Sequence, residues 1–305
     1  MNKKPIYVEI PIKADLEEIW QKTQTPELHE QWDLRFSSIS YLPKKTEEEP
    51  QSFLYDRNIG LGIKVAGWGE SVGTHNKQDG TRTSSLHFGT DQKISPIKKG
   101  KGYWKYIPVE EGTIFLTQYD YEIRNKGIFG MMVDFIFRPL IGWGTALSFD
   151  VLKRWLEKGE LPRLQYLRFY CSTLITALFF LVWAYQGLVP KILAMHPVEL
   201  TMLSHLTSME AEKANGLLMF IGVGEIIFGA VWLFYRNKRQ LHALQLLIFP
   251  ILTLVAVFAE PSVTAHPFNP LTFNLSLWIL SFVGFLLGKD LPTAANCIRT
   301  RRKRY

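Results

Sequence analysis

An unbroken apolar run over residues 169–189 constrains what this chain can fold into more than any other stretch. Its 21 residues include no charged side chain, and it lies between Arg168 and Lys191. A helix rises about 1.5 Å per residue, so a run of this length crosses a hydrocarbon layer of about 30 Å. The run therefore predicts a membrane-spanning helix.

Three further apolar runs follow, and no comparable run precedes residue 169. They lie at residues 216–235, 241–259 and 271–288, and only the first of them contains a carboxylate, that of Glu225. The pattern predicts a polar first half followed by an all-α bundle of four transmembrane helices. The expected division is a domain over residues 1–160, a linker at 161–168, the membrane bundle at 169–288 and a basic tail at 289–305.

Lys and Arg residues gather on one side of the predicted spans. They precede the first span, lie between the second and third, and follow the fourth, where the chain ends in RTRRKRY. The other two loops are mainly acidic. Because positively charged loops stay in the cytoplasm, we expect a multi-pass protein of a bacterial plasma membrane with both termini cytoplasmic. The basic residues beside the membrane favour anionic lipid headgroups, not nucleic acid, as their partner.

Short runs of strand-forming residues fill most of the first half. They lie at residues 7–12, 36–42, 53–57, 65–72, 83–88, 103–107 and 114–123. Two short helices are expected between the first two strands, because Asp15 is a suitable N-cap and Thr25-Pro26 interrupts the helical pattern. A long apolar helix over about residues 128–158 closes this half. The stretch 99–102 is expected to be a turn between strands, and the glycines at 67–69 are expected to form turns or strand bulges.

This order of elements resembles the helix-grip fold of the START/Bet v 1-like superfamily (SRPBCC), which includes polyketide cyclase-type members. The stretches that carry the resemblance are VEIPIKADLEEIWQ…PELHEQWD and GYWKYIPVEEGTIFLTQYDYEI. The resemblance implies an α+β domain in which an antiparallel sheet wraps a long C-terminal helix. It also implies an apolar cavity between sheet and helix, suited to a hydrophobic small molecule.

Alternation along the last strand places its aromatic residues on one face, and the resemblance directs that face toward the cavity. The candidate ligand-binding residues are Trp68, Trp104, Tyr106, Phe115, Tyr119, Tyr121, Phe135 and Arg138. The alternative is that these side chains simply form the core. We expect no cofactor and no metal site, because the two cysteines, Cys171 and Cys297, form no CxxC pair and the histidines match no metal-binding spacing.

Glu225 is the one carboxylate inside a predicted span, and it shares a helix face with Gly222 and Gly229. A charge facing lipid costs about 2.5–3.5 kcal/mol on insertion scales, so this side chain is expected to point into the bundle. Two roles stay open, one in proton transfer or ligand binding and one as a structural hydrogen-bonding group. The candidate polar site of the bundle comprises Gln186, Lys191, His196, Glu225, His242 and Asn274.

The stretches WAYQGLVPKIL…HPVEL and GVGEIIFGAVWL resemble the DoxX-like family of four-helix membrane proteins. This resemblance implies a link to redox or oxidative-stress functions. Three hypotheses follow. In the first, the cytoplasmic domain binds a lipid, quinone or isoprenoid as carrier or sensor; in the second, the protein is a redox subunit with a quinone-binding bundle and a membrane redox partner. The third, a cyclase or hydrolase, lacks a recognisable acid/base pair.

Overall fold

The computed structural model describes residues 4–301 except residues 47, 61 and 126. The chain divides into two compact units. Unit 1 consists of Met1–Tyr166 together with Pro292–Tyr305, and unit 2 is Leu167–Leu291. The chain therefore leaves unit 1 once, builds unit 2, and returns to unit 1 at its C-terminal end.

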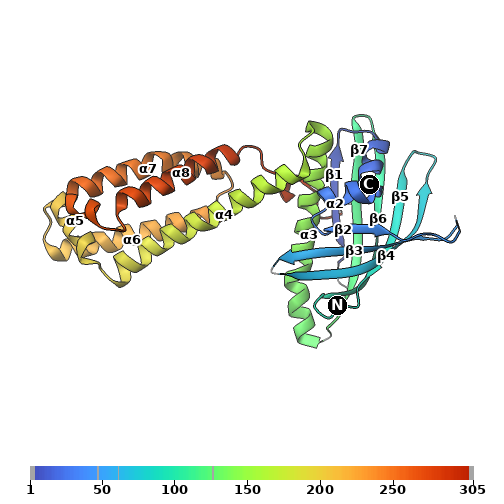
Figure 1. Ribbon diagram of the computed structural model, residues 1–305, viewed down its shortest axis with the longest axis horizontal. Helices are drawn as coiled ribbons and strands as arrows, with labels where there is room; N and C mark the ends of the chain where they lie inside the picture. The colour runs from blue at the N-terminus through green and yellow to red at the C-terminus, as the bar shows by residue number, and fades with distance from the viewer. Residues whose placement is uncertain (1–3, 47, 61, 126, 302–305) are drawn as a thin grey trace. The chain divides into compact units, whose positions relative to one another are not determined.

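In the described part of unit 1, seven antiparallel strands form one sheet in the order β1-β7-β6-β5-β4-β3-β2 (Figure 1). The strands are β1 Ile6–Ile12, β2 Ser38–Tyr41, β3 Gln51–Gly60, β4 Ile63–Asn76, β5 Arg82–Gly89, β6 Ile97–Val109 and β7 Gly112–Ile123. The helices are α1 Leu16–Gln24, α2 Pro26–Trp32 and α3 Gly127–Lys158. The predicted α+β class, with a long helix closing an antiparallel sheet, is confirmed.

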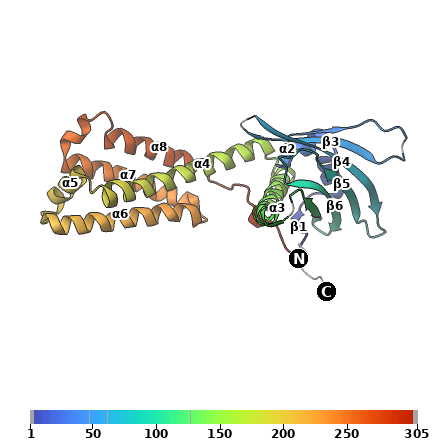
Figure 2. The same ribbon diagram turned by 90° about the horizontal axis from the view of Figure 1, so that it is seen from below.

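Local interactions explain where the two short helices begin and how the long helix packs on the sheet. The Asp15 carboxylate accepts a hydrogen bond from the Glu18 backbone N–H at 2.8 Å and so caps α1. Pro26 occupies the start of α2, where a missing N–H costs nothing. The second half of α3 then packs on the sheet, and the rings of Phe115 and Phe149 stack with centroids 4.4 Å apart. Figure 2 shows α3 along its axis, lying across the inner side of the curved sheet.

The glycines at 67–69 and 99–102 lie inside strands, so the expectation of turns there is wrong. The sheet register explains this placement, because Gly69 faces Phe53 in β3 and Gly100 faces Phe88 in β5. A Cβ atom at either glycine would collide with the facing ring. Glycine is therefore required at these positions, because the facing aromatic ring occupies the place that a side chain would take.

The stretch of residues 292–298 packs on unit 1. Beyond the short 3₁₀ helix η3 (Ala294–Asn296), the backbone of Ile298 exchanges two hydrogen bonds with Glu9 of β1, both 2.9 Å. Asp150 of α3 is buried and accepts from the Thr293 N–H at 2.9 Å and from Asn296 Nδ2 at 2.8 Å. Part of the stretch expected as a basic tail at 289–305 therefore belongs to unit 1, from Pro292 to the last described residue, Arg301.

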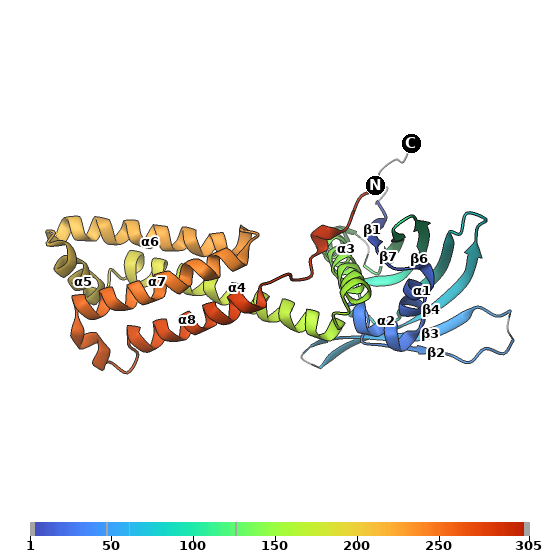
Figure 3. The same cartoon turned by 90° about the horizontal axis from the view of Figure 1, so that it is seen from above.

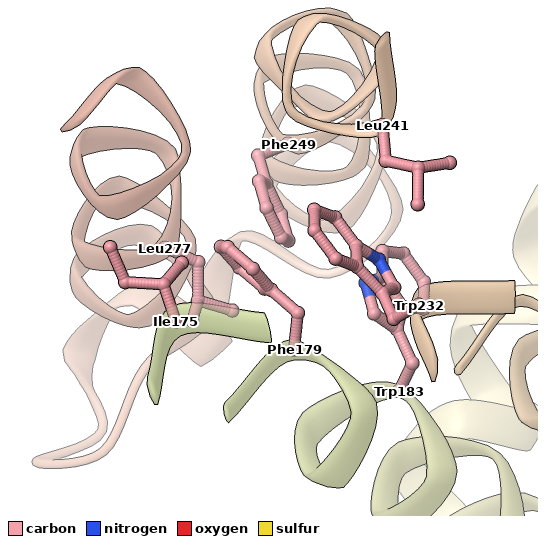
Figure 4. Packing of buried hydrophobic residues seen from close by; sticks show 7 residues of the cluster. All are labelled: Ile175, Phe179, Trp183, Trp232, Leu241, Phe249 and Leu277. Atoms are coloured by element: carbon pink, nitrogen blue, oxygen red, sulfur yellow. The ribbon is translucent and has the colours of Figure 1, made fainter. Parts of the chain in front are cut away.

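Unit 2 is helical. Its helices are α4 Pro162–Gln186, which begins in unit 1 and continues into the π-helical turn η1 Gly187–Leu193, then α5 Pro197–Thr207, α6 Ala211–Phe234, α7 Lys238–Ala259, η2 Pro261–Ala265 and α8 Pro270–Leu287 (Figure 3). Residues 162–168, placed in a linker by the sequence, form the first turns of α4. Side chains from α4, α6, α7 and α8 point toward one another at its centre (Figure 4). They are Ile175, Phe179, Trp183, Trp232, Leu241, Phe249 and Leu277.

Among the described residues, five helices are long and apolar enough to cross a membrane: α3, α4 with η1, α6, α7 and α8. The last four match the predicted spans. More than half of the apolar stretch of α3 is buried inside the protein, against about a fifth in each of the others. Composition alone therefore does not separate α3 from the spans, whereas packing against a sheet does.

We predict that Asp150→Asn releases the C-terminal segment. The Asn side chain would turn an N–H group toward donors that now reach a carboxylate, including Arg154 Nε at 3.0 Å. We expect unit 1 to lose about 2–4 kcal/mol of unfolding free energy and residues 292–299 to become accessible to protease. Thermal unfolding and limited proteolysis of the full-length protein measure both effects. The exposed Asp91→Asn is the matched control, and equal behaviour of the two variants would contradict the prediction.

Candidate functional site

Unit 1 encloses a cavity of about 690 Å³ between the inner face of the sheet, the α1–α2 region and α3. Its size falls in the range of about 300–1,000 Å³ typical of small-molecule sites. Aromatic and aliphatic side chains dominate the wall, including Phe53, Tyr55, Leu86, Phe88 and Phe137. The cavity is the candidate ligand site of this protein.

Two of the eight candidate ligand-binding residues, Trp104 and Tyr119, line this cavity. Tyr106 and Phe115 face the same side of the sheet but lie in the packed core, and the Tyr106 hydroxyl bonds Thr23 at 2.7 Å. They belong to the end of the sheet that the second half of α3 covers. For these two side chains the structure favours the alternative of a core role.

The other four candidates lie outside the cavity. Trp68 is on the outer face of the sheet and is 40% exposed, because its position in β4 has the parity opposite to Val65 and Ser71, which line the cavity. Tyr121 donates to Asp134 at 3.0 Å. Phe135 and Arg138 belong to a separate open groove between residues 4–7 and α3. The expectation that these four side chains line the cavity is therefore wrong.

Three polar residues that sequence reasoning missed line or support the cavity wall: His29, Asp33 and Arg35. Asp33 is fully buried, and its carboxylate accepts from Arg35 Nε at 2.9 Å and from Arg35 Nη2 at 2.5 Å. It also faces His29 Nε2 at 3.1 Å. The His29 ring lies among aromatic side chains, with centroids 5.1 Å from Trp32 and 4.9 Å from Trp104. The wall therefore holds a hydrogen-bonded ion pair and an imidazole inside an apolar space.

Burial lowers the pKa of His29 from its ordinary value, and the neighbouring Asp33 offsets only part of that effect. Burial alone would raise the pKa of Asp33, but the charge and hydrogen bonds of Arg35, with His29, lower it well below its usual range. Burial also raises the pKa of Tyr119, whose hydroxyl bonds Thr145 at 2.8 Å. At neutral pH the cluster consists of a neutral imidazole beside a closed ion pair.

The signal for this cluster was present in the sequence. In PELHEQWDLR, His29 and Asp33 are four residues apart, which brings them together on one turn of a helix. In the sequence alone, this stretch contributes only to the fold resemblance. The third partner, Arg35, lies beyond the end of the helix. Whether its side chain reaches Asp33 therefore depends on the conformation of the loop, which helical spacing does not predict.

In unit 2 the candidate polar residues separate into different environments. Lys191 is buried, and its Nζ lies 3.1 Å from Glu225 and 3.5 Å from Glu199. Gly187 and Gly222 allow this pairing, because a side chain on either glycine would collide with the backbone of the other helix. Glu225 thus faces protein and shares a cation with a second carboxylate.

The remaining four lie elsewhere in unit 2. His242 is buried in the aromatic cluster, with its ring centroid 4.8 Å from that of Trp232. His196 is exposed and caps α5 by accepting from the Val198 N–H at 3.4 Å. Gln186 and Asn274 are half-buried on α4 and α8. The structure therefore brings together Lys191 and Glu225 but does not gather the six side chains into one site.

Among the described residues, no group of three or more His, Cys, Asp or Glu side chains is placed to hold a metal ion.

The known proteins to which this chain is similar match different parts of it. A family model described as the DoxX-like family matches residues 180–282. The STAR-related lipid transfer protein of Xanthomonas axonopodis has 17% identity and a TM-score of 0.38, covering 50% of this chain and 85% of its own. The Zhui aromatase/cyclase from Streptomyces sp. R1128 has 9% identity and a TM-score of 0.36, covering 51% and 97%. These two likenesses concern only the fold of unit 1.

The architecture defines a membrane protein that joins an antiparallel sheet closed by a long helix to a helical bundle, within which residues 180–282 match the DoxX-like family. Over its length the chain is 38% identical to the uncharacterized membrane protein YndG of Bacillus subtilis, with 99% of this chain and 100% of YndG aligned. It belongs to the same family as YndG.

We predict that His29 makes the stability of unit 1 depend on pH between 7 and 5. Its folded-state pKa is lowered, so the unfolded chain takes up the proton first as pH falls through about 6.5. The folded state then loses up to about 1.4 kcal/mol per pH unit. Asp33 adds nothing in this window, because stability from a lowered carboxyl pKa is lost only below about pH 4.

The measurement is the unfolding temperature of the full-length protein at pH 7, 6 and 5. We expect a fall in the wild type and a smaller one in His29→Phe, which keeps an aromatic ring in place. His75→Phe, at an exposed strand position, should behave like the wild type. Identical pH profiles for all three proteins would show that His29 is not responsible.

We predict that Lys191→Met destabilises unit 2 by about 3 kcal/mol, because it leaves Glu225 and Glu199 without their shared cation in an apolar environment. Adding Glu225→Leu to this variant should recover part of the loss, since the uncompensated carboxylate is removed. Thermal unfolding in lipid nanodiscs measures the double-mutant cycle, with the exposed Lys213→Met as control. Strictly additive losses would mean that the pair is not energetically coupled.

Proposed function

We propose that the protein is a carrier or sensor for a hydrophobic small molecule, which occupies the cavity of unit 1. The observation that carries this proposal is a cavity of about 690 Å³ with a mainly aromatic and aliphatic wall. Protein interiors are otherwise packed as densely as organic crystals, so a space of this size indicates a site kept open for a ligand. Burying apolar ligand surface there would contribute about 25 cal/mol for each Å².

The construction of the wall supports the proposal. The cavity extends beneath strands whose inward positions include glycines, such as Gly67 in β4 and Gly102 in β6, where an added Cβ atom would collide with the facing tyrosine. Those glycines face Tyr55 and Tyr119, which line the cavity. The same pairing of a tyrosine with a glycine thus recurs on two strand pairs along the cavity wall. A cavity left by poor packing at one point would show no such repetition.

The first half of α3 supports exchange of the ligand with a bilayer. Phe137, Leu140 and Ile141 line the cavity on this half. Other large apolar side chains of the same half are more than half exposed: Ile128, Phe129, Met131, Met132, Phe135 and Ile136. An exposed apolar surface of this kind is unfavourable in water and suits contact with membrane or with an apolar ligand in transit. We assign this half of α3 as the route between cavity and lipid.

We further propose that unit 1 lies in the cytoplasm, with both ends of the chain on that side of a plasma membrane. The chain leaves unit 1 after Tyr166 and returns at Pro292, so the number of crossings between these points must be even. The four helices α4, α6, α7 and α8 satisfy this condition. The excess of Lys and Arg beside the ends of the bundle favours the cytoplasmic side and contact with anionic lipid headgroups.

We predict that Leu86→Trp abolishes ligand retention, because the indole would fill the cavity from the middle of β5. The protein is released gently from membranes, and bound molecules are identified by native mass spectrometry with lipid extraction. We expect the wild type to retain an apolar molecule at one copy per chain and Leu86→Trp to lose it.

His87→Trp is the matched control, since it adds the same indole at the next residue of β5, on the exposed outer face. It should retain the ligand. Recovery of bulk phospholipid alone from the wild type, in the same amount as from Leu86→Trp, would refute the proposed function.

A further inference from the structure

The cluster of His29, Asp33 and Arg35 is a polar feature of the cavity that binding of a purely apolar molecule would leave unused. We infer that the ligand carries a hydroxyl group at one end, which donates to Nδ1 of His29 and accepts from the guanidinium of Arg35. This inference rests on the proposed function and adds the chemical class of the ligand: an apolar alcohol or phenol.

The hydrogen-bonding capacity of Asp33 is already engaged. Oδ1 accepts from the Arg35 backbone N–H at 3.0 Å and from Arg35 Nε at 2.9 Å. Oδ2 accepts from Arg35 Nη2 and lies 3.1 Å from His29 Nε2. The carboxylate is also completely buried. Asp33 therefore acts as a support that orients its two neighbours, and a ligand would meet the neighbours themselves.

This support determines which nitrogen of His29 carries the hydrogen. An ionised carboxylate can only accept, so Nε2 must donate to Asp33. In the neutral ring Nδ1 then holds a lone pair and acts as an acceptor. Among the described residues none donates a hydrogen bond to Nδ1, and the ring lines the cavity. His29 thus presents an acceptor to whatever the cavity holds.

Arg35 presents the opposite chemistry beside it. Its side chain has five N–H groups, of which two are directed to Asp33 and another interacts with the Tyr119 hydroxyl, so the remaining ones are left for a ligand oxygen. The guanidinium lies over the ring of Tyr119, 5.5 Å from its centroid, and both residues line the cavity. The ion pair with Asp33 holds the guanidinium in a fixed plane and offsets its charge.

An acceptor and a donor side by side select among ligand groups. A hydroxyl oxygen can donate to His29 and accept from Arg35 at once. A ketone or a carboxylate accepts only and would place a lone pair against Nδ1, while an ammonium group would face the cation of Arg35. An alkyl end would leave both protein groups without a partner in an apolar space, which is costly. The hydroxyl satisfies every group of the cluster.

The test compares two probes of the same shape, 1-hydroxypyrene and 1-methylpyrene, bound to the full-length protein in lipid nanodiscs. Saturable energy transfer from tryptophan to pyrene reports binding. The quantity measured is the ratio of the two apparent affinities in each protein, because partitioning of the probes into lipid cancels when ratios are compared between variants.

We expect the ratio to favour 1-hydroxypyrene about tenfold more in the wild type than in His29→Phe, as loss of a buried hydrogen bond predicts. Arg35→Lys, which keeps a cation beside Asp33, should lower the ratio as well. His75→Phe should match the wild type. Unchanged affinity of His29→Phe for 1-methylpyrene would show that its cavity is intact.

Equal ratios in the wild type, His29→Phe and Arg35→Lys would overturn the inference and leave the proposed function standing, since both probes still bind. If neither probe binds the wild type saturably, or if Leu86→Trp binds them as well as the wild type, the proposed function fails and the inference fails with it.

Discussion

The contact between α3 and the sheet is the interaction on which the rest of unit 1 depends. In its second half, the helix is buried and supplies Phe149 to the aromatic core and Asp150 to the returning end of the chain. In its first half, the helix draws away from full burial and forms one side of the cavity through Phe137 and Ile141. The same helix thus packs against the core, forms a wall of the cavity and binds the C-terminal segment. It can do so because its two halves contact different parts of a curved sheet.

The return of the chain constrains unit 2 as well. Ile298 pairs with β1, so the helix bundle is an insertion whose two ends are both attached to one folded domain. Four membrane helices meet this condition, and a fifth span within the same segment would not. Inside the bundle, aromatic packing and the Lys191–Glu225 ion pair hold the helices together, because lipid provides no hydrophobic driving force for their association.

The cavity combines two kinds of surface for separate reasons. Its apolar wall follows from the register of β3 to β7, where aromatic residues face glycines across neighbouring strands. Its polar cluster follows from the short helix α2 and the loop after it, which bring both His29 and Arg35 into contact with the carboxylate of Asp33. Affinity for an apolar ligand and selection of its polar end therefore lie on different elements, and each can be altered without the other.

The sequence by itself determined the properties that depend on neighbouring residues: the four apolar spans, the strands of the sheet, the cap at Asp15 and the alternation that turns Tyr119 inward. Tertiary structure decided the properties that depend on distant residues. It placed Trp68 on the outer face of the sheet and Phe115 in the core. It also placed the glycines at 67–69 and 99–102 inside strands, and it packed the apolar helix α3 against the sheet. It also joined Lys191 to Glu225 and completed the His29 cluster with Arg35. Local periodicity specifies which face a side chain takes, whereas the surface that covers that face comes from elsewhere in the chain.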